Sequence, residues 1–524
     1  MAVFVSAAEA VSKIKDGDVL GMTGFNCIDL PEELTKAIQK QYLEQGHPRD
    51  LTLIYSAGLG DGKETGANHF GEEGLVKRLL CGHVGLSPRL GKLANENKLS
   101  LFMVPQGTFS HLHRAAAGHR PGVLTKIGLK TYADPRVEGC RANQAAFDSG
   151  EEIVELVNIE GEEYLFYKSQ PLDVCFLKAT YADEDGNLSF EDAPIIADPL
   201  ELASSAHNNG GIVIAQVNQI LARGSIRPND ILVHNFMVDY IVVGAPENCM
   251  QTQDCDHTRR EMTGKFRIPV ASIKPPVLDV RKVCGRRAAM ELEEHSFVNL
   301  GFGIPEWVSL VGAEEGIADQ VIFSVESGPI GGVPLSGQSM GSSYNYEARY
   351  KTGDMFDLVD GGCLAMTCLG AAQIDEKGNV NVSKFNGRMT GPGGFVNISQ
   401  TAKKVCFVGT FTAGGFSSEI KDGSLSIVKE GKIKKYVKEV EQITFSGEYA
   451  LESGQEVLYI SERAVFKLTD RGVMLIEIAP GVDIEKDILG QMEFRPVISD
   501  ALKTMDERIF KDMRMGLELK KRPL

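Results

Sequence analysis

The chain has 524 residues, of which 43% are hydrophobic, and its formal net charge is −16. This length exceeds what one hydrophobic core usually organises, so we expect at least two large domains in an ordinary globular chain. The acidic balance, without a strong basic stripe, argues against a nucleic-acid partner.

The ten cysteines are dispersed, and none forms a C-x-x-C pair. The sequence therefore predicts neither a zinc site nor a thioredoxin-like motif. We expect the cysteines to be ordinary thiols that are kept reduced. The start of the chain has no basic leader, and its first arginine is Arg49, so we expect neither a secretory signal nor a mitochondrial presequence. No uninterrupted apolar run approaches the roughly 20 residues of a membrane helix. We expect a cytoplasmic protein with no membrane partner.

The first 40 residues predict a helix, a polar turn, an apolar strand, a glycine loop and a second helix. That second helix begins near Pro31, where proline is favoured because its missing N–H would be unpaired anyway. The glycine-rich loop at residues 58–66 resembles a P-loop only superficially. Ala57 stands where the first glycine would fall, and Glu64 replaces the Ser or Thr.

Three histidines follow in a helical pattern that has no acid or cysteine at ligand spacing. They are His111, His113 and His119. We interpret them as structural or surface histidines and predict no metal site.

Residues 267–282 contain three prolines among charges and are the best candidate for a linker. We therefore predict two domains, at residues 1–270 and 271–524. Similar patterns recur in the two, and the matched segments are 6–38 with 283–312, 174–192 with 364–385, and 210–220 with 404–415.

The recurrence predicts an α/β fold of two similar, open, largely parallel-sheet domains that arose by internal duplication. Sheets of this kind bind ligands at the carboxyl ends of their strands. Within the second half, the Gly-Arg-Arg run at residues 285–287 fits a phosphate contact and a polar helix face equally well.

The stretch VIFSVESGPIGGVP, at residues 321–334, places one carboxylate, Glu326, at the end of an apolar strand with no Lys or Arg in the stretch. A structural glutamate held by glycine N–H groups is one interpretation. A nucleophile that attacks an activated acyl group from a dry, glycine-lined cleft is the other. The residue types favour the two about equally.

The motif SVESGPIGGVP resembles the active-site motif of family I coenzyme A transferases, in particular the acetate/propionate branch. The resemblance covers essentially the whole chain, because further family-like segments follow in the same order. They are DGDVLGMTGF, VPQGTF, VNLGFGIPE, GNVNVSKFNGRMTGPGGF, GTFTAGG, ITFSGEYAL, ISERAVFKLT and LIEIAPGVDIEKDIL.

The chain departs from the family pattern in two places. Thr23 and Asp29 stand where the first signature has glycines. Residues 325–328 read V-E-S-G, where the branch that uses oxoacids has S-E-N-G. The second departure argues against succinyl and oxoacid substrates and favours short-chain monocarboxylates.

The resemblance implies that the active site lies between the two domains and that Glu326 forms a glutamyl-CoA thioester. It implies that Gln106 and a backbone N–H of Gly393 or Gly394, of which we favour Gly394, bind the oxyanion. It also implies residues that hold the coenzyme A arm, namely Asn299, Gly301, Gly303, Gly391, Gly393 and Phe395. Coenzyme A is then a substrate, and no tightly bound cofactor is expected.

The implied function is transfer of CoA between short-chain acyl-CoA and free acids such as acetate and propionate, with butyrate and lactate as further candidates. The family also implies a homo-oligomer, a tetramer or a dimer. An acyl-CoA hydrolase of the same fold and a non-catalytic metabolite-binding module are the alternatives, since fold does not fix function.

Overall fold

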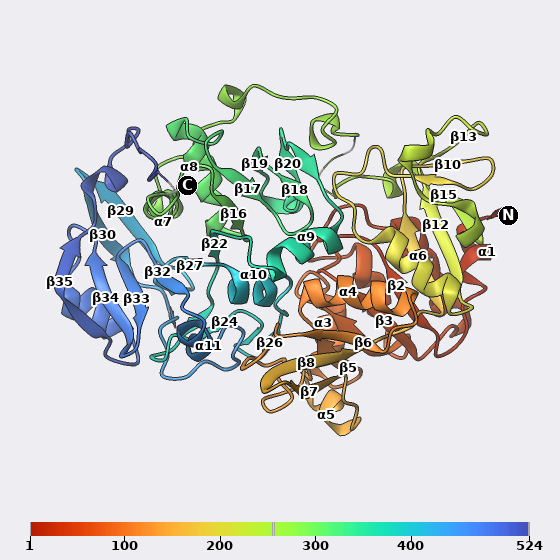
Figure 1. The fold of residues 1–524 in the computed structure, drawn as a ribbon, viewed down its shortest axis with the longest axis horizontal. Coiled ribbons are helices and arrows are strands. Elements are labelled where there is room, and N and C mark those ends of the chain that lie inside the picture. Colours follow the sequence, from red (N-terminus) through yellow and green to blue (C-terminus); the bar gives the residue numbers. More distant parts are fainter. Residues whose placement is uncertain (1, 254, 256, 522–524) are drawn as a thin grey trace.

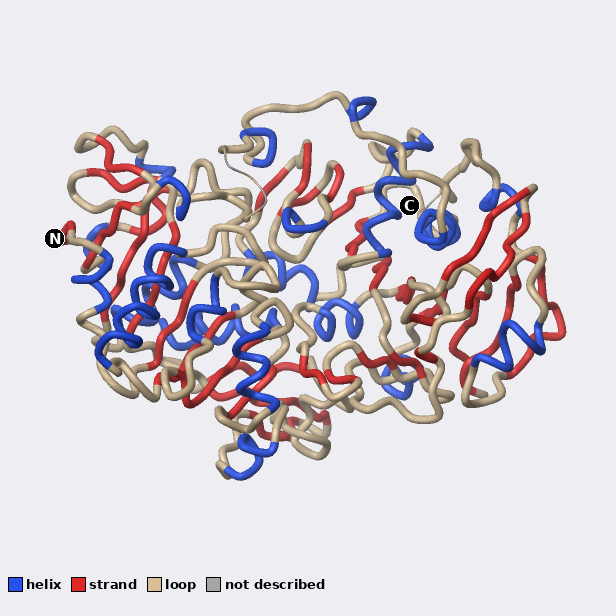
Figure 2. The backbone as a smooth tube through the Cα atoms, turned by 180° about the vertical axis from the view of Figure 1, so that it is seen from behind, coloured by secondary structure: helices blue, strands red, loops and turns tan. Residues whose placement is uncertain are grey.

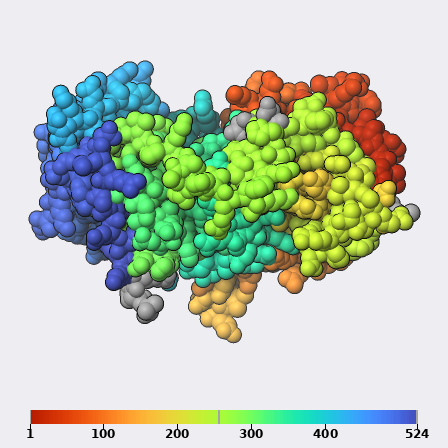
Figure 3. All heavy atoms as spheres, turned by 90° about the horizontal axis from the view of Figure 1, so that it is seen from above, coloured from red at the N-terminus to blue at the C-terminus, as the bar shows by residue number. Residues whose placement is uncertain are grey.

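The computed structural model describes residues 2–253, 255 and 257–521. Two parts lie side by side, one from each half of the chain, and each is built around its own β-sheet (Figure 1). The space-filling view in Figure 3 shows the two parts in broad contact, with the yellow-green chain near residues 257–290 running across both. Among the described residues, no helix combines the length and the apolar character that a membrane span requires.

The sheet of the first half has eight strands, and every neighbouring pair in it is parallel. Parallel strands that are covered on both faces are apolar along their whole length, and β9 is buried at every residue. In spatial order the strands are β1 (Val3–Phe4), β15 (Tyr240–Val243), β12 (Ile212–Val217), β9 (Val174–Lys178), β2 (Val19–Met22), β3 (Leu51–Tyr55), β4 (Val76–Cys81) and β5 (Ser100–Met103).

Helices connect these strands. Helix α2 (Glu32–Gln45) begins directly after Pro31, as predicted, and ends at Gly46, whose left-handed backbone suits glycine. Helix α4 (Gln106–Ala117) follows β5 and packs against α6 (Pro199–Asn208) at the boundary with the second half. The other elements are α1 (Ala7–Val11), α3 (Pro88–Asn95), α5 (Gln144–Asp148), a sheet of β6 (Gly122–Thr125), β8 (Glu162–Lys168) and β7 (Val154–Ile159), and a sheet of β13 (Gln219–Leu221), β10 (Tyr181–Asp183), β11 (Leu188–Ser189) and β14 (Ile231–Val233).

The sheet of the second half has ten strands and is seen from behind in Figure 2. Its strands, in spatial order, are β21 (Ala348–Arg349), β18 (Pro329–Ile330), β17 (Ile322–Ser324), β16 (Phe297–Leu300), β22 (Met366–Leu369), β27 (Lys404–Val408), β32 (Glu456–Ile460), β33 (Ala464–Thr469), β34 (Gly472–Ile478) and β35 (Val497–Thr504). Its helices are α7 (Val280–Ala289), α8 (Trp307–Glu315), α9 (Thr352–Asp360), α10 (Phe395–Thr401) and α11 (Gly447–Glu452).

Five small two-stranded ribbons complete the second half. They pair β19 (Val333–Pro334) with β20 (Ser343–Tyr344), β23 (Gln373–Ile374) with β24 (Val380–Asn381), β25 (Lys384–Phe385) with β26 (Arg388–Met389), β28 (Thr412–Ala413) with β31 (Ile433–Lys434), and β29 (Ser417–Lys421) with β30 (Ser424–Lys429).

The two large sheets share one strand order over five strands. The run β15-β12-β9-β2-β3 in the first sheet corresponds to β32-β27-β22-β16-β17 in the second, and both runs are parallel throughout. The predicted α/β fold and its duplication are thus confirmed. The second sheet adds antiparallel strands at both ends, which the repeated segments of the sequence did not indicate.

Each half has its own hydrophobic core. The largest core draws on residues 10–242, with Val396 as its one member from the second half, and two further cores lie within residues 283–515. Between them, residues 267–279 contain only one short helical turn, Val270–Ser272. The predicted division at residue 270 falls inside this segment and remains a prediction.

The contact between the halves is centred on α4. The N–H of Gly107 donates to Asn397 Oδ1 of α10 over 3.1 Å, and the N–H of Gly353 in α9 donates to Asp198 Oδ1 over 2.9 Å. Gly107 must be glycine here, because a Cβ would lie 2.5 Å from the Phe356 ring. Hydrogen bonds between backbone and side chains therefore fix the two sheets relative to each other.

The Gly-Arg-Arg run lies inside α7, and the structure fits neither interpretation of it. Arg286 is completely buried, and its guanidinium donates to the carbonyls of Ile509, Lys511 and Met513. Arg287 pairs with Glu477 over 2.7 Å. Arg286 therefore holds the chain's last segment against α7, and Arg287 ties α7 to β34 of the second sheet. The sequence could not reveal either contact because the partners lie more than 180 residues away.

Replacing Arg286 by Met should destabilise the protein, because the carbonyls that it caps would be left buried without donors. We expect a loss of about 3 kcal/mol or more in the free energy of unfolding, seen as a lower midpoint of thermal unfolding. The matched control is Arg495→Ala, whose ion pair with Glu485 is exposed on both sides and should change stability by less than about 1 kcal/mol. Equal midpoints for the two variants would contradict this role.

Candidate active site

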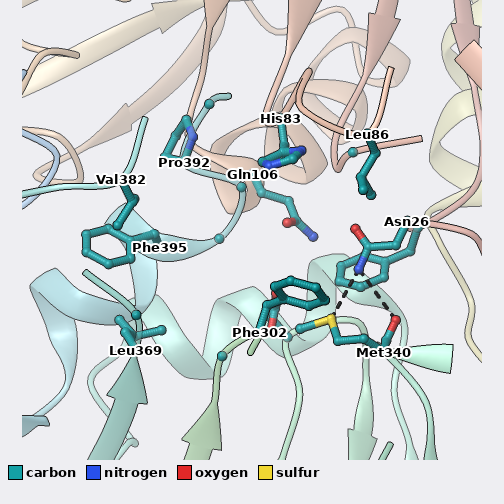
Figure 4. A pocket seen from close by; sticks show the side chains of 18 of the residues that line it. Asn26, His83, Leu86, Gln106, Phe302, Met340, Leu369, Val382, Pro392 and Phe395 are labelled. Atoms are coloured by element: carbon teal, nitrogen blue, oxygen red, sulfur yellow. Dashed lines mark hydrogen bonds between the residues drawn. The ribbon is translucent and has the colours of Figure 1, made fainter. Parts of the chain in front are cut away.

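A cavity of about 460 Å³ lies between the two halves of the chain, within the range of small-molecule sites. Its lining contains no Lys or Arg among the described residues, and it contains two carboxylates, Asp61 and Glu326. Figure 4 shows Gln106 near the middle, Asn26, Leu86 and Met340 on one side, and Val382, Leu369 and Phe395 on the other. The lining also includes Phe25, Cys27, Gly58, His83, Gly301, Phe302, Gly337, Gln338, Gly370, Gly391, Pro392, Gly393, Gly394 and Ile398.

Glu326 lies two residues beyond the carboxyl end of β17 and is only 7% exposed. The turn that places it requires Gly328, because a Cβ there would lie 2.1 Å from the Tyr350 carbonyl oxygen. Burial raises the pKa of the Glu326 carboxyl above its ordinary value, and its backbone N–H and the Asn299 side chain oppose the rise. Its Oε2 has no hydrogen-bond partner among the described residues. The carboxylate is therefore both buried and incompletely satisfied.

Gln106 is the first residue of α4. Its backbone N–H donates to the carbonyl of Gly393 over 3.0 Å, so the start of this helix is tied to the glycine loop of the other half. The side chain is 2% exposed, and its Nε2 has no partner in the described part of the chain. An enclosed amide N–H group without an acceptor is rare in proteins and here lines the cavity that also contains Glu326.

The loop of residues 391–394 passes next to both side chains. The N–H of Gly393 donates to the Gly82 carbonyl over 2.8 Å, and that of Gly391 donates to Ser383 over 3.0 Å. For the N–H of Gly394, no hydrogen bond with a described residue is found. A Cβ at Gly394 would lie 3.2 Å from Cγ of Glu326. Of the two predicted donors, Gly394 is thus the one whose N–H is not already used.

The strand β16 and the loop after it contribute the next group. Asn299 is completely buried, lies beside Glu326, and has an Nδ2 without a partner of good geometry among the described residues. Gly301 lines the cavity, and Gly303 does not. The Gly303 N–H donates to Glu306 Oε1 over 3.1 Å, and burial raises the pKa of that carboxyl to about 7. Gly303 therefore shapes the loop from outside the cavity.

The structure brings together most of the residues that the sequence predicted. Seven line the cavity, and Asn299 adjoins it. The seven are Gln106, Gly301, Glu326, Gly391, Gly393, Gly394 and Phe395.

Apart from Gln106, the sequence interpretation missed the residues with which the first half lines the cavity. Asn26, Gly58 and His83 lie on loops that follow β2, β3 and β4 at the carboxyl edge of the first sheet. The rule that open parallel sheets bind ligands at this edge would have indicated these loops. It could not show that the edge faces Glu326.

The sequence predicted that three histidines in and near α4 are structural or surface residues and do not bind a metal. His113 is buried and stacked on Phe109, and His111 lies 3.0 Å from Asp357. Burial lowers the pKa of both imidazoles, in the case of His113 to about 4. Among the described residues, no group of three or more His, Cys, Asp and Glu side chains could hold a metal ion.

Comparisons with known proteins agree on one family. The family model of coenzyme A transferase matches residues 4–244. Caffeate CoA-transferase of Acetobacterium woodii is 45% identical over 524 residues, which is 99% of each chain. Acetate CoA-transferase YdiF of Escherichia coli K12 is 42% identical over 98% of this chain and 96% of its own length.

A solved structure is similar over nearly the whole chain. The acyl-CoA transferase YdiF of E. coli O157:H7, in its thioester complex with CoA, superposes with a TM-score of 0.94 at 41% identity and covers 99% of this chain and 98% of its own.

Replacing Glu326 by Gln should stabilise the folded protein at neutral pH. Because the pKa of this carboxyl is raised on folding, the folded state binds the proton more tightly, and wild-type stability falls as the pH rises above the unfolded value of about 4.3. We expect a higher thermal midpoint for Glu326→Gln than for wild type at pH 7, with the difference shrinking toward pH 4.5. The exposed Glu439→Gln should show no such difference. A wild type that is the more stable at pH 7 would contradict the assignment.

Proposed function

The chain belongs to the coenzyme A transferase family, and we propose that it moves CoA between short-chain acyl-CoA and free monocarboxylic acids through a thioester on Glu326. The proposal depends on how the Glu326 side chain is buried. It is buried in a cavity without cations, and one of its oxygens has no partner among the described residues. A carboxylate in an ion pair would be a weaker nucleophile, whereas one with little hydration can attack an acyl group.

The reaction proceeds in balanced steps. A carboxylate oxygen of Glu326 attacks the carbonyl carbon of the donor acyl-CoA, the C–S bond breaks, and CoA leaves as a thiolate. The product on the protein is a mixed anhydride. The thiolate then attacks the glutamyl carbonyl, the anhydride C–O bond breaks, and the first acid leaves as a carboxylate. The acceptor acid attacks the resulting glutamyl-CoA thioester and passes through the same steps in reverse.

Each addition step places negative charge on a carbonyl oxygen. Gln106 Nε2 and the Gly394 N–H are donors without partners among the described residues, and both belong to the lining that contains Glu326. Fixed donors of this kind act without reorganisation, and each contributes about 3 kcal/mol to the transition state. We assign the oxyanion to these two groups.

Coenzyme A is a substrate in this scheme. We assign its pantetheine arm to the side of the cavity formed by Gly301, Gly391, Gly393 and Phe395, with Asn299 and Gly303 holding the neighbouring loop. Within the described part of the chain the lining has no Lys or Arg, so the phosphates are expected to stay outside it. The chemistry needs no resident cofactor.

The acids are proposed from the same lining. Without a cation, the cavity favours acetate and propionate, with butyrate and lactate as further candidates, over acids that carry a second charge. The names of the two curated relatives, which refer to acetate and caffeate, identify the acids that should be compared first. We further propose a cytoplasmic homo-oligomer, a tetramer or a dimer.

Incubation with acetyl-CoA in the absence of an acceptor acid should add the mass of CoA less water to the protein. Borohydride should then reduce the thioester and mark Glu326 in the peptide map, and Glu326→Ala should not be labelled. Gln106→Ala should form the adduct at a rate lower by about 100-fold or more, because one oxyanion donor is lost. A mark on another residue would contradict the mechanism. Continued release of acetate without an acceptor, beyond the one equivalent per protein that formation of the thioester produces, would indicate a hydrolase.

Succinate should be a poor acceptor. Its second carboxylate would be buried without a partner, which costs several kcal/mol, whereas each added methylene of a monocarboxylate contributes about 0.8 kcal/mol. With acetyl-CoA as donor, we expect kcat/KM for succinate to lie about 100-fold or more below that for propionate. Equal values would overturn the proposed substrate class. Caffeate in the same panel would show whether a bulky acid is excluded by size.

A further inference from the structure

The position of the Gln106 amide depends on how the first turn of α4 is held. Its Nε2 has no partner among the described residues, and the amide extends into the cavity (Figure 4). The first N–H groups of a helix have no acceptor within the helix and need one from elsewhere. Pro105, which precedes α4, supplies no side-chain cap, and the first turn is buried. The acceptors for this turn therefore come from other parts of the chain.

Two of these acceptors belong to the second half. The Gln106 N–H donates to the Gly393 carbonyl over 3.0 Å. The Gly107 N–H donates to Oδ1 of Asn397, a completely buried residue of α10, over 3.1 Å. The approach is so close that a Cβ on Gly107 would lie 2.5 Å from Asn397 Nδ2. Asn397 thus supplies the side-chain cap that α4 lacks in its own sequence.

Asp360 fixes which atom of the Asn397 amide faces Gly107. Asn397 Nδ2 donates to Asp360 Oδ1 over 2.9 Å, which leaves Oδ1 of the amide for the Gly107 N–H. Burial raises the pKa of the Asp360 carboxyl to about 7, and the hydrogen bond from Asn397 opposes the rise. His111 of α4 approaches the other carboxyl oxygen with its Nδ1 at 3.8 Å. An ionised carboxylate only accepts hydrogen bonds, so it holds the amide in the orientation that α4 requires.

We propose that Asn397 is a positioning residue for the oxyanion donor Gln106. It caps α4 from the opposite half and so sets where Gln106 Nε2 lies relative to Glu326. The inference rests on the proposed function. Asn397 is not part of the cavity lining, so it acts through Gln106 and not by contact with the substrate. Because a misplacement of about 1 Å is enough to slow a reaction strongly, loss of the cap should slow the chemistry without weakening the binding of acyl-CoA.

The test measures formation of the thioester from acetyl-CoA in the absence of an acceptor acid. Two quantities are needed, the maximal rate and the acetyl-CoA concentration that gives half of it. Asn397→Ala should lower the maximal rate about tenfold, the effect of one lost hydrogen bond, and leave the half-saturating concentration within about twofold of wild type. In the Gln106→Ala background the same change should lower the rate less than about twofold, because the donor that Asn397 positions is absent.

Gln400 is the matched control, because it joins the same two halves from the same helix. Its Oε1 accepts from the Gly128 N–H over 2.7 Å, and its Nε2 donates to the Lys126 carbonyl over 2.7 Å. Neither partner belongs to α4. Gln400→Ala should lower the thermal midpoint much as Asn397→Ala does, and it should leave the rate of thioester formation within about twofold of wild type.

An exchange of the two side chains keeps the test decisive if Asn397→Ala does not fold. Asn397→Asp alone places a second carboxylate against Asp360, which is unfavourable at about pH 8 and should slow thioester formation. Adding Asp360→Asn restores the hydrogen bond in the reverse direction and leaves an acceptor facing Gly107. The Asn397→Asp/Asp360→Asn double variant should therefore recover a rate within about threefold of wild type.

The outcomes separate the positioning role from the proposed function. A loss in Asn397→Ala that disappears in the Gln106→Ala background supports the role, as does recovery in the double variant. An equal loss in both backgrounds, the same loss in Gln400→Ala, or a double variant as slow as Asn397→Asp overturns it and leaves the proposed function standing. Failure of wild type to form the thioester, or a Gln106→Ala variant as fast as wild type, overturns the proposed chemistry and the positioning role with it.

Discussion

The structure depends on keeping one carboxylate buried without neutralising it. An ion pair would satisfy Glu326 and reduce its nucleophilicity, and bulk water would hydrate it and hydrolyse the acyl intermediates. The protein meets both demands with a cavity that contains no Lys or Arg among the described residues. The raised pKa of the Glu326 carboxyl is the direct consequence. In the proposed mechanism, the unfavourable burial of this carboxylate serves the reaction, and packing elsewhere must offset its cost.

The duplicated fold provides the two walls of such a cavity. Each large sheet has a carboxyl edge from which short loops emerge, and the halves are placed so that the edge of one faces the edge of the other. The proposed nucleophile, Glu326, comes from the loop after β17, and Gln106 comes from the start of α4 on the opposite half. The bond from the Gln106 N–H to Gly393 and the bond from the Gly393 N–H to Gly82 join both halves directly at the site. The second half alone holds the proposed nucleophile and only one of its two proposed oxyanion donors, Gly394, so the proposed site needs both halves.

How much the sequence predicted depended on how local each signal was. The repeated strand patterns are local, and residue types alone predicted the duplication from them. The lone carboxylate of Glu326 is also local, but its residue types left a structural and a nucleophilic role equally open, and only the family resemblance favoured the nucleophile. The roles of Gln106 and the 391–394 loop came only from the family resemblance, because nothing in an isolated PQG or GPGG segment specifies an oxyanion site. The choice between Gly393 and Gly394 required knowing which N–H was already bonded to Gly82. Arg286 was ambiguous because its carbonyl partners lie at the far end of the chain.

His83 shows why the remaining part of the site was invisible in the sequence. On its own it is one histidine after an apolar strand, where a structural role is the ordinary expectation. Its position becomes informative through three features that only the fold creates: glycines at positions 58 and 85 that leave room for the ring, an enclosed Nδ1 without a partner among the described residues, and a cavity shared with Glu326. Glu326, the proposed reactive carboxylate, is recognisable in the sequence because the residues around it include no Lys or Arg. A residue that lines the cavity from the other half is recognisable only once the fold brings the two halves together, so the chemistry of such a site can be inferred from sequence earlier than its specificity.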